Sequence, residues 1–223
     1  EYTKSGLLVL EPEDQALALS WGEQLPQPLI KLDKSAIKVC EPALTISTDQ
    51  AIWMPEVAQI RNPRLVRAAH DGIKKHITIR ENSAVTGFLI EKGRLRGIKL
   101  ESEFIPTERA IVCAGAWSGD LLKNLVPTPK IEPVLGQMIL FRSQPGAITR
   151  IVLHQDRYVI PRRDGRVLVG STLEYRGFEK TTTEDARQSL KAYAIDHFPL
   201  LEKAEIEHHW AGLRPGSPCG IPY

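Results

Sequence analysis

The sequence predicts a mixed α+β protein. Short apolar runs that alternate with polar residues are typical of strands, and they dominate the second half of the chain. The turn signals Lys92-Gly93 and Arg163-Asp164-Gly165 each stand between two such runs and predict hairpins. Segments with helix start signals lie between the strands, but without a strict β–α–β alternation, which favours the α+β class.

In the first half, strands and helices follow one another irregularly. We expect strands at residues 3–10, 51–54, 77–80 and 110–113, and a hairpin over residues 84–100. Helices are expected at residues 13–25, 34–41, 62–76 and 117–124. Glu13 and Asp14 favour the dipole of the first helix, and Asn62 followed by Pro63 is a suitable N-cap and first-turn pair.

The second half is mostly strand. Strands are expected at residues 134–142, 157–160, 167–173 and 205–213. One helix should begin after the N-cap Thr183, because Glu184 and Asp185 follow it, and it should end near His197, before Pro199.

The composition excludes several classes of protein. The chain has 223 residues, of which 42% are hydrophobic and 25% charged, as in a folded chain of one large or two small domains. Its net charge is only +2, so a nucleic-acid partner is not expected. The apolar runs are too short to span a bilayer, so no membrane partner is expected either.

The cysteines and the chain ends suggest where the protein works and how complete it is. Cys40, Cys113 and Cys219 form no C-x-x-C pair and no disulfide framework, which favours a reducing compartment and a cytoplasmic location. The chain starts at Glu1 rather than Met and stops at Tyr223 within a Gly/Pro-rich run. We interpret it as a piece of a larger protein.

Several common site patterns are absent from the sequence. There is no G-x-G-x-x-G and no P-loop, and residues 115–119 (GAWSG) differ from a nucleophile elbow because Ser118 stands in the fourth place. His208 and His209 would point to opposite faces of a strand. No metal site is therefore expected.

Three other segments combine residues that could form a site. In residues 110–118 (AIVCAGAWS), small residues end an apolar strand and leave room for a ligand, although a plain strand-to-helix turn is the alternative. In residues 210–216 (WAGLRPG), Arg214 could hold a carboxylate through two hydrogen bonds or form only a surface ion pair. In residues 158–162 (YVIPR), Tyr158 offers a phenol or is a core aromatic.

Together these segments resemble the D-amino-acid oxidase family of flavoproteins. Residues 210–216 match its W-A-G-L-R-P-G without a gap, and residues 158–172 resemble its Y-x-V-P-R-x-x-G-R-x-x-V-G-x-T hairpin. Weaker matches are residues 6–10, 38–44 (KVCEPAL), 55–61 (PEVAQIR), 110–119 and 133–138 (PVLGQM). The resemblance implies FAD as the cofactor of the parent protein.

The resemblance also implies a domain organisation. The family begins with a strand and a G-x-G-x-x-G helix and ends with a glycine-rich segment over the flavin, and this chain contains neither. The chain would then hold a substrate-binding domain, with a mostly antiparallel sheet plus helices, in residues 1–57 and 131–213. Residues 58–130 and 214–223 would be the remnant of a Rossmann-like FAD-binding domain.

Matching positions carry implied roles in the substrate site. Arg214 would clamp the substrate carboxylate, and Tyr158 would lie beside it as the second catalytic-site residue. Leu173 would add an apolar wall to the substrate pocket. Asp156 stands where a relative has a histidine, so the resemblance carries no proton-relay role to this position.

Three further positions would contact the cofactor. Val85 matches a residue whose backbone contacts the adenine side of FAD. Ala114 and Gly115 would lie near the same cofactor.

The implied reaction is oxidation of an amine next to a carboxylate. A hydride would pass from the α-carbon of glycine, a small D-amino acid or N-methylglycine to FAD, with oxygen as acceptor. Two alternatives stay open: a non-catalytic α+β module, and a D-amino-acid or sarcosine dehydrogenase type with another electron acceptor.

The isolated chain is expected to be inactive and to bind no FAD. It should expose apolar residues at 77–79 and 110–112, where a neighbouring strand would lie. Because exposed strand edges can pair with a second copy of the chain, a homo-oligomer is one possible state of the protein.

Overall fold

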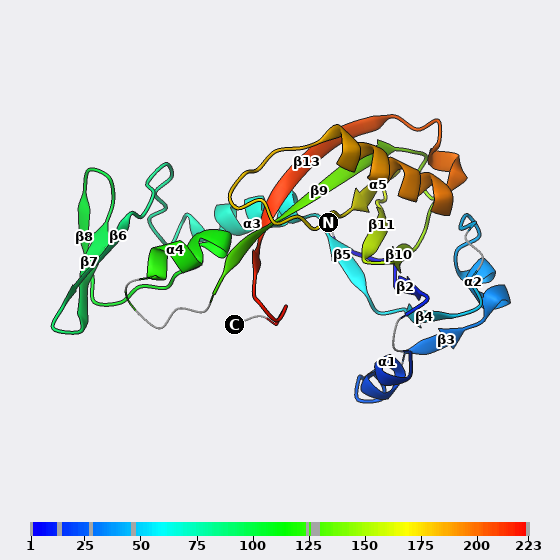
Figure 1. Cartoon of the computed structure of the whole chain (residues 1–223), viewed down its shortest axis with the longest axis horizontal. Coiled ribbons are helices and arrows are strands. Elements are labelled where there is room, and N and C mark those ends of the chain that lie inside the picture. Colours follow the sequence, from blue (N-terminus) through cyan, green and yellow to red (C-terminus); the bar gives the residue numbers. More distant parts are fainter. Residues whose placement is uncertain are drawn as a thin grey trace. The chain divides into compact units, whose positions relative to one another are not determined.

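The computed structural model describes residues 2–12, 15–26, 29–45, 48–123, 125 and 130–221. The chain divides into two compact units (Figure 1). Unit 1 comprises Glu1–Leu65, Leu135–Glu174 and Glu179–Gly212, and unit 2 comprises Val66–Val134, Tyr175–Phe178 and Leu213–Tyr223. That one unit binds substrate and the other belongs to an FAD-binding domain stays a prediction.

Unit 1 is built on an eight-stranded sheet in the order β13-β9-β12-β11-β10-β2-β4-β3, to which unit 2 contributes one end of β9 and of β13. The strands are β2 (Leu7–Leu10), β3 (Ile30–Leu32), β4 (Ala51–Met54), β9 (Glu132–Arg142), β10 (Ile151–His154), β11 (Arg157–Pro161), β12 (Arg166–Gly170) and β13 (Ile206–Gly216). Of the pairs whose register is described, only β10 with β2 is parallel. The expected mostly antiparallel α+β fold is confirmed.

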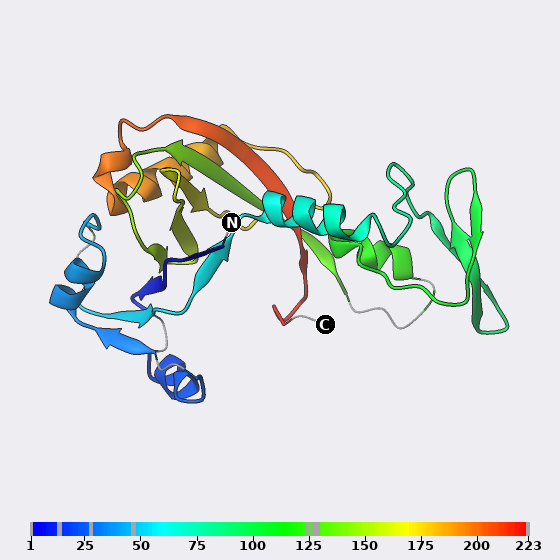
Figure 2. The same cartoon turned by 180° about the vertical axis from the view of Figure 1, so that it is seen from behind.

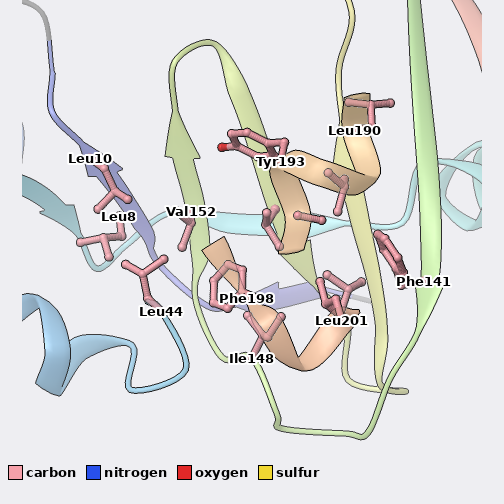
Figure 3. Packing of buried hydrophobic residues seen from close by; sticks show 14 of the residues in the cluster. Leu8, Leu10, Leu44, Phe141, Ile148, Val152, Leu190, Tyr193, Phe198 and Leu201 are labelled. Atoms are coloured by element: carbon pink, nitrogen blue, oxygen red, sulfur yellow. The ribbon is translucent and has the colours of Figure 1, made fainter. Parts of the chain in front are cut away.

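One helix covers a face of this sheet and closes the core. Helix α5 (Glu184–His197) begins at the predicted N-cap Thr183, whose side chain accepts a hydrogen bond from the backbone N–H of Ala186. Its buried Leu190, and Phe198 just beyond it, pack with apolar residues of the strands, as Figure 3 shows. Burying these side chains provides most of the free energy that holds helix and sheet together.

The smaller elements of unit 1 lie around this core. Helices α1 (Gln15–Gly22) and α2 (Lys34–Cys40) come from the first part of the chain, η2 (Pro199–Leu201) follows α5, and β1 (Tyr2–Lys4) pairs with β5 (Ala58–Ile60). Asp33 caps α2 by accepting a hydrogen bond from the backbone N–H of Ala36 at 2.8 Å. Glu13 and Asp14, expected in the first turn of α1, lie outside the described residues.

Unit 2 contains a three-stranded meander of β6 (Gly87–Glu91), β7 (Arg94–Lys99) and β8 (Phe104–Pro106), seen from behind in Figure 2. Lys92 and Gly93 both have positive φ, so the hairpin predicted over residues 84–100 turns where expected. The helical turns η1 (Gly115–Trp117) and α4 (Ser118–Leu122) follow, and Asn124, the expected helix end, lies outside the described residues. Helix α3 (Asn62–Ile73) starts in unit 1 and continues in unit 2.

Two predicted strands are wrong. Residues 77–80 and 110–113 belong to no strand, although both are rich in apolar residues. A strand requires a neighbour for its peptide groups, and no described strand pairs with either segment. Their apolar side chains are accordingly exposed, Ile77 by 55% and Ile111 by 92%, as the sequence led us to expect.

Other boundaries differ for local reasons. The single strand expected at residues 3–10 is two strands, because Gly6 turns the chain at φ +68°. A Cβ at Gly6 would lie 1.9 Å from the ring of Trp53, so only glycine fits there. Strand β12 ends at Gly170, earlier than predicted, and β13 continues to Gly216, beyond the predicted end. No helix in the described part is long and apolar enough to cross a membrane.

Candidate functional site

Unit 2 holds an apolar pocket of about 670 Å³. It is lined by Ala84, Val85, Thr86, Phe88, Ile98, Ala110, Ile111, Val112, Cys113, Ala114, Trp117, Asp120 and Leu121. The volume is within the range of small-molecule sites, and the walls suit a flat heterocycle better than a phosphate. Two of the three predicted cofactor residues, Val85 and Ala114, therefore line one pocket.

The turn beside this pocket explains the sequence GAWSG. Gly115, the third predicted cofactor residue, is not among the lining residues, but its φ of +55° turns the chain out of the pocket wall. Trp117 then stacks on Phe178 with 5.5 Å between the ring centroids. A Cβ at Gly119 would lie 3.0 Å from the carbonyl oxygen of Ile131, so this glycine allows a close backbone approach. The motif serves packing as well as the pocket.

The pocket fits only part of FAD. Its apolar wall could hold the adenine side, and Asp120 is the one carboxylate among its lining residues. A pyrophosphate is normally held by backbone N–H groups of a glycine-rich turn, and the sequence has no G-x-G-x-x-G. The described residues thus suit one end of the cofactor.

Tyr158 lies in unit 1, on β11, and is half-buried rather than a core aromatic. Its phenol donates a hydrogen bond to Sδ of Met138 at 3.2 Å. Leu173, three residues beyond β12, is 64% exposed. Arg214 is an exposed residue of β13 that belongs to unit 2. A joint substrate site of these three residues therefore stays a prediction.

Gln137 is a buried polar residue whose role the sequence pattern did not predict. It donates to Oε1 of Glu174 at 2.8 Å and to Oγ1 of Thr183 at 3.2 Å. Its Oε1 accepts the backbone N–H of Thr183 and Nε2–H of His209. Burial, with the nearby charge of Arg187, lowers the pKa of His209, so its neutral form is favoured. The network ties the segment after β12 to α5 and β13.

Glu41 explains the weaker motif KVCEPAL. It is 1% exposed, and its Oε2 accepts three hydrogen bonds, from the backbone N–H and hydroxyl of Thr149 and from the backbone N–H of Arg150, at 2.7 to 2.9 Å. Oε1 accepts the backbone N–H of Ala43 at 3.2 Å. This carboxylate binds the loop before β10 to the end of α2, so its role is structural.

A pair of buried histidines joins β10 to α5. Nδ1 of His197 is 2.7 Å from the carbonyl oxygen of Tyr193 and must donate to it. Nε2 of His197 then accepts the hydrogen bond from Nδ1–H of His154 at 2.8 Å. Nε2 of His154 has no hydrogen-bond partner among the described residues and lies 3.5 Å from a carboxylate oxygen of Glu11. Burial is the main cause that lowers the pKa of His197.

The pocket, the tyrosine and the buried carboxylate lie in a chain that matches one family over its whole length. Residues 1–223 match the family described as DAO, FAD dependent oxidoreductase, and the chain belongs to this family. The resemblance inferred from the motifs is thereby confirmed.

Within the family, the chain is similar to glycine oxidases, as its motifs also suggest. It is 45% identical to glycine oxidase of Pseudomonas putida over 225 residues, which cover 100% of this chain and 62% of that protein. It is 40% identical to the Pseudomonas aeruginosa glycine oxidase, with coverage of 98% and 60%. The chain therefore spans about three fifths of the length of these curated relatives.

Solved structures agree on the fold. Glycine oxidase from Geobacillus kaustophilus has a TM-score of 0.92 at 22% identity, covering 100% of this chain and 62% of that chain. The enzyme from Bacillus cereus has a TM-score of 0.88 at 25% identity, covering 100% of this chain and 63% of that chain.

Proposed function

We propose that this chain is part of a glycine oxidase that oxidises glycine or a similarly small amino acid, such as N-methylglycine. The observation that carries the proposal is the 45% identity to a glycine oxidase along the entire chain. The pocket lined by Val85 and Ala114 supports an FAD site whose remaining part comes from elsewhere in the protein.

The residues of this chain would bind and orient the substrate. The guanidinium of Arg214 would hold the substrate carboxylate through paired, charge-assisted hydrogen bonds. The phenol of Tyr158 would donate to the same carboxylate, and Leu173 would supply an apolar wall. FAD, when bound, would accept the hydride from the α-carbon and pass the electrons to oxygen.

No side-chain base is needed if the amine binds in its neutral form. Asp156, which stands where a relative has a histidine, lies exposed in the turn between β10 and β11 with a φ of 63°. A solvated carboxylate in a tight turn is poorly placed to take a proton from a bound amine. The chain's contribution is therefore orientation and charge.

The imine product could feed thiazole assembly in thiamine biosynthesis. This proposal is supported by the 30% identity, over 94% of this chain, to a protein of Nostoc named bifunctional protein ThiO/ThiG. Hydrolysis of the imine to an oxo acid is the alternative. A cytoplasmic location is also proposed, since all three cysteines are free.

The test uses the whole protein that contains this chain, purified and assayed with glycine, N-methylglycine and D-alanine. We expect flavin absorbance, oxygen consumption and one hydrogen peroxide per turnover. Arg214→Ala should raise KM strongly and cost about 3 kcal/mol in kcat/KM, because a bidentate charged contact is lost. A colourless protein, or kinetics unchanged by Arg214→Ala, would contradict the proposal.

A further inference from the structure

Tyr158, Gly170 and Met138 form a row across three neighbouring strands. On the sheet, β12 lies between β11 and β9. Tyr158 is paired with Gly170, and Gly170 is paired with Met138. Directly opposed residues of a sheet share one face, so all three stand on the same side.

The next row fixes which face this is. Val159, Val169 and Ile139 are paired across the same three strands, and each is 0% exposed. They belong to the core beneath α5. Because side chains alternate along a strand, Tyr158 and Met138 lie on the opposite face of the sheet, away from that core.

Gly170 makes the contact between the outer two residues possible. A Cβ at this position would lie 2.8 Å from Cγ of Met138 and 2.9 Å from Oη of Tyr158. Real Cβ atoms are not found so close to other heavy atoms, so any side chain would push the two apart. Without one, the phenol lies across the middle strand and reaches the thioether sulfur at 3.2 Å.

The chemistry of this acceptor matters. A thioether sulfur is a weak hydrogen-bond acceptor, whereas a carboxylate is a strong one. The sulfur can therefore hold the phenolic hydrogen in a fixed direction and still lose it to an arriving anion. A carbonyl or carboxylate in its place would compete with the substrate.

We propose that Met138 and Gly170 are positioning residues, which hold the hydroxyl of Tyr158 ready for a substrate carboxylate. Gly170 leaves the space, and Met138 provides the temporary acceptor. On binding, the phenolic O–H exchanges sulfur for a carboxylate oxygen, and no covalent bond changes. The inference rests on the proposed function, because it requires that the hydroxyl of Tyr158 contacts the bound substrate.

A double-mutant cycle in the flavin-loaded protein tests this coupling. Met138→Leu removes the acceptor at similar volume, and we expect it to raise KM for glycine about threefold to tenfold while kcat changes less than about twofold. In a Tyr158→Phe background the same change should alter KM by less than about 1.5-fold. Met54→Leu, on β4 of the same sheet, is the matched control. Equal effects of Met138→Leu in both backgrounds, or no effect in either, would overturn the inference.

A second readout does not depend on turnover. The tyrosine doublet in the Raman spectrum reports whether a phenol donates a hydrogen bond, and the signal of Tyr158 is isolated from that of the other tyrosines as the difference from Tyr158→Phe. Met138→Leu should abolish the donor signature in the substrate-free protein. An unchanged doublet would overturn the role of Met138. A doublet that changes, in a protein that oxidises no amino acid, would instead refute the proposed function and with it the substrate role of the row.

Discussion

Replacing Glu41 by glutamine should destabilise unit 1 without changing its shape. Four hydrogen bonds converge on the carboxylate of Glu41, three on Oε2 and one on Oε1. The most stable orientation of the glutamine side chain places its amide nitrogen toward Ala43. In this orientation the hydrogen bond from the backbone N–H of Ala43 is lost, and two donors face each other. The three bonds from Thr149 and Arg150 remain but lose the charge of their acceptor.

The magnitude follows from these contacts. A hydrogen bond to a charged group contributes about 1 kcal/mol more than a neutral one, and one lost bond contributes about 1 kcal/mol. The total of about 4 kcal/mol is offset by the lower cost of burying a neutral amide. We expect Glu41→Gln to lower the free energy of unfolding by about 2 to 3 kcal/mol.

Urea denaturation followed by tryptophan fluorescence measures this change, with the exposed Glu101→Gln as control. A decrease below about 0.5 kcal/mol, the usual range of a neutral surface change, would refute the reasoning. It would mean that the loop before β10 does not need the carboxylate.

Three other predictions concern the turn at Gly6, the histidine pair and the apolar pocket of unit 2. Gly6→Ala should cost more than about 2 kcal/mol in urea unfolding, because it is strained at φ +68° and its Cβ would overlap the ring of Trp53; an unchanged midpoint would show that the ring can move aside. Burial holds the pKa of His197 below its ordinary 6.5, so the unfolded chain takes up this proton first as the pH falls. Stability should therefore decrease below about pH 6.5, at up to about 1.4 kcal/mol per pH unit, and His197→Gln should flatten this slope in urea titrations between about pH 7 and 5; an equally steep slope in the variant would contradict it. In the whole protein that contains this chain, Ala114→Phe should fill the pocket and lower FAD affinity at least about tenfold, measured as flavin absorbance per protein against an exposed Ala69→Phe control, and full flavin content would place the cofactor elsewhere.

The sequence predicted those elements that interactions between neighbouring residues determine. The hairpin over residues 84–100 and the helix after Thr183 were predictable because their turn and cap residues act on neighbours. The strands expected at residues 77–80 and 110–113 were wrong because an apolar run specifies a strand only if a partner exists. Strand β10 was missed because it is short and its place depends on residues far away in the chain.

The candidate site likewise contains residues that the sequence predicted and residues whose roles depend on distant parts of the chain. Val85 and Ala114 were found through a family resemblance, and the structure places both in one pocket. Gln137 and Glu41 lay inside quoted motifs, but their partners are far off in the sequence, so only the fold could reveal the networks. The row through Gly170 depends on the register of three strands, which no single segment encodes.

The parallel pairing of β2 with β10 affects the order in which the strands of the sheet can pair during folding. Strands β2, β3 and β4 come from the first part of the chain, whereas β9 to β12 come from a later part, and the two groups meet where Leu7 pairs with Ile151. During synthesis, β2 is made before β10. Until β10 is available, the backbone N–H and C=O groups along the β10 side of β2 stay unpaired. Such long-range closure is slow, and an open strand edge invites pairing with other chains. We therefore expect the pairing of β2 with β10 to limit the folding rate. Before this pairing, we expect a chaperone or a second nascent chain to bind the unpaired edge of β2.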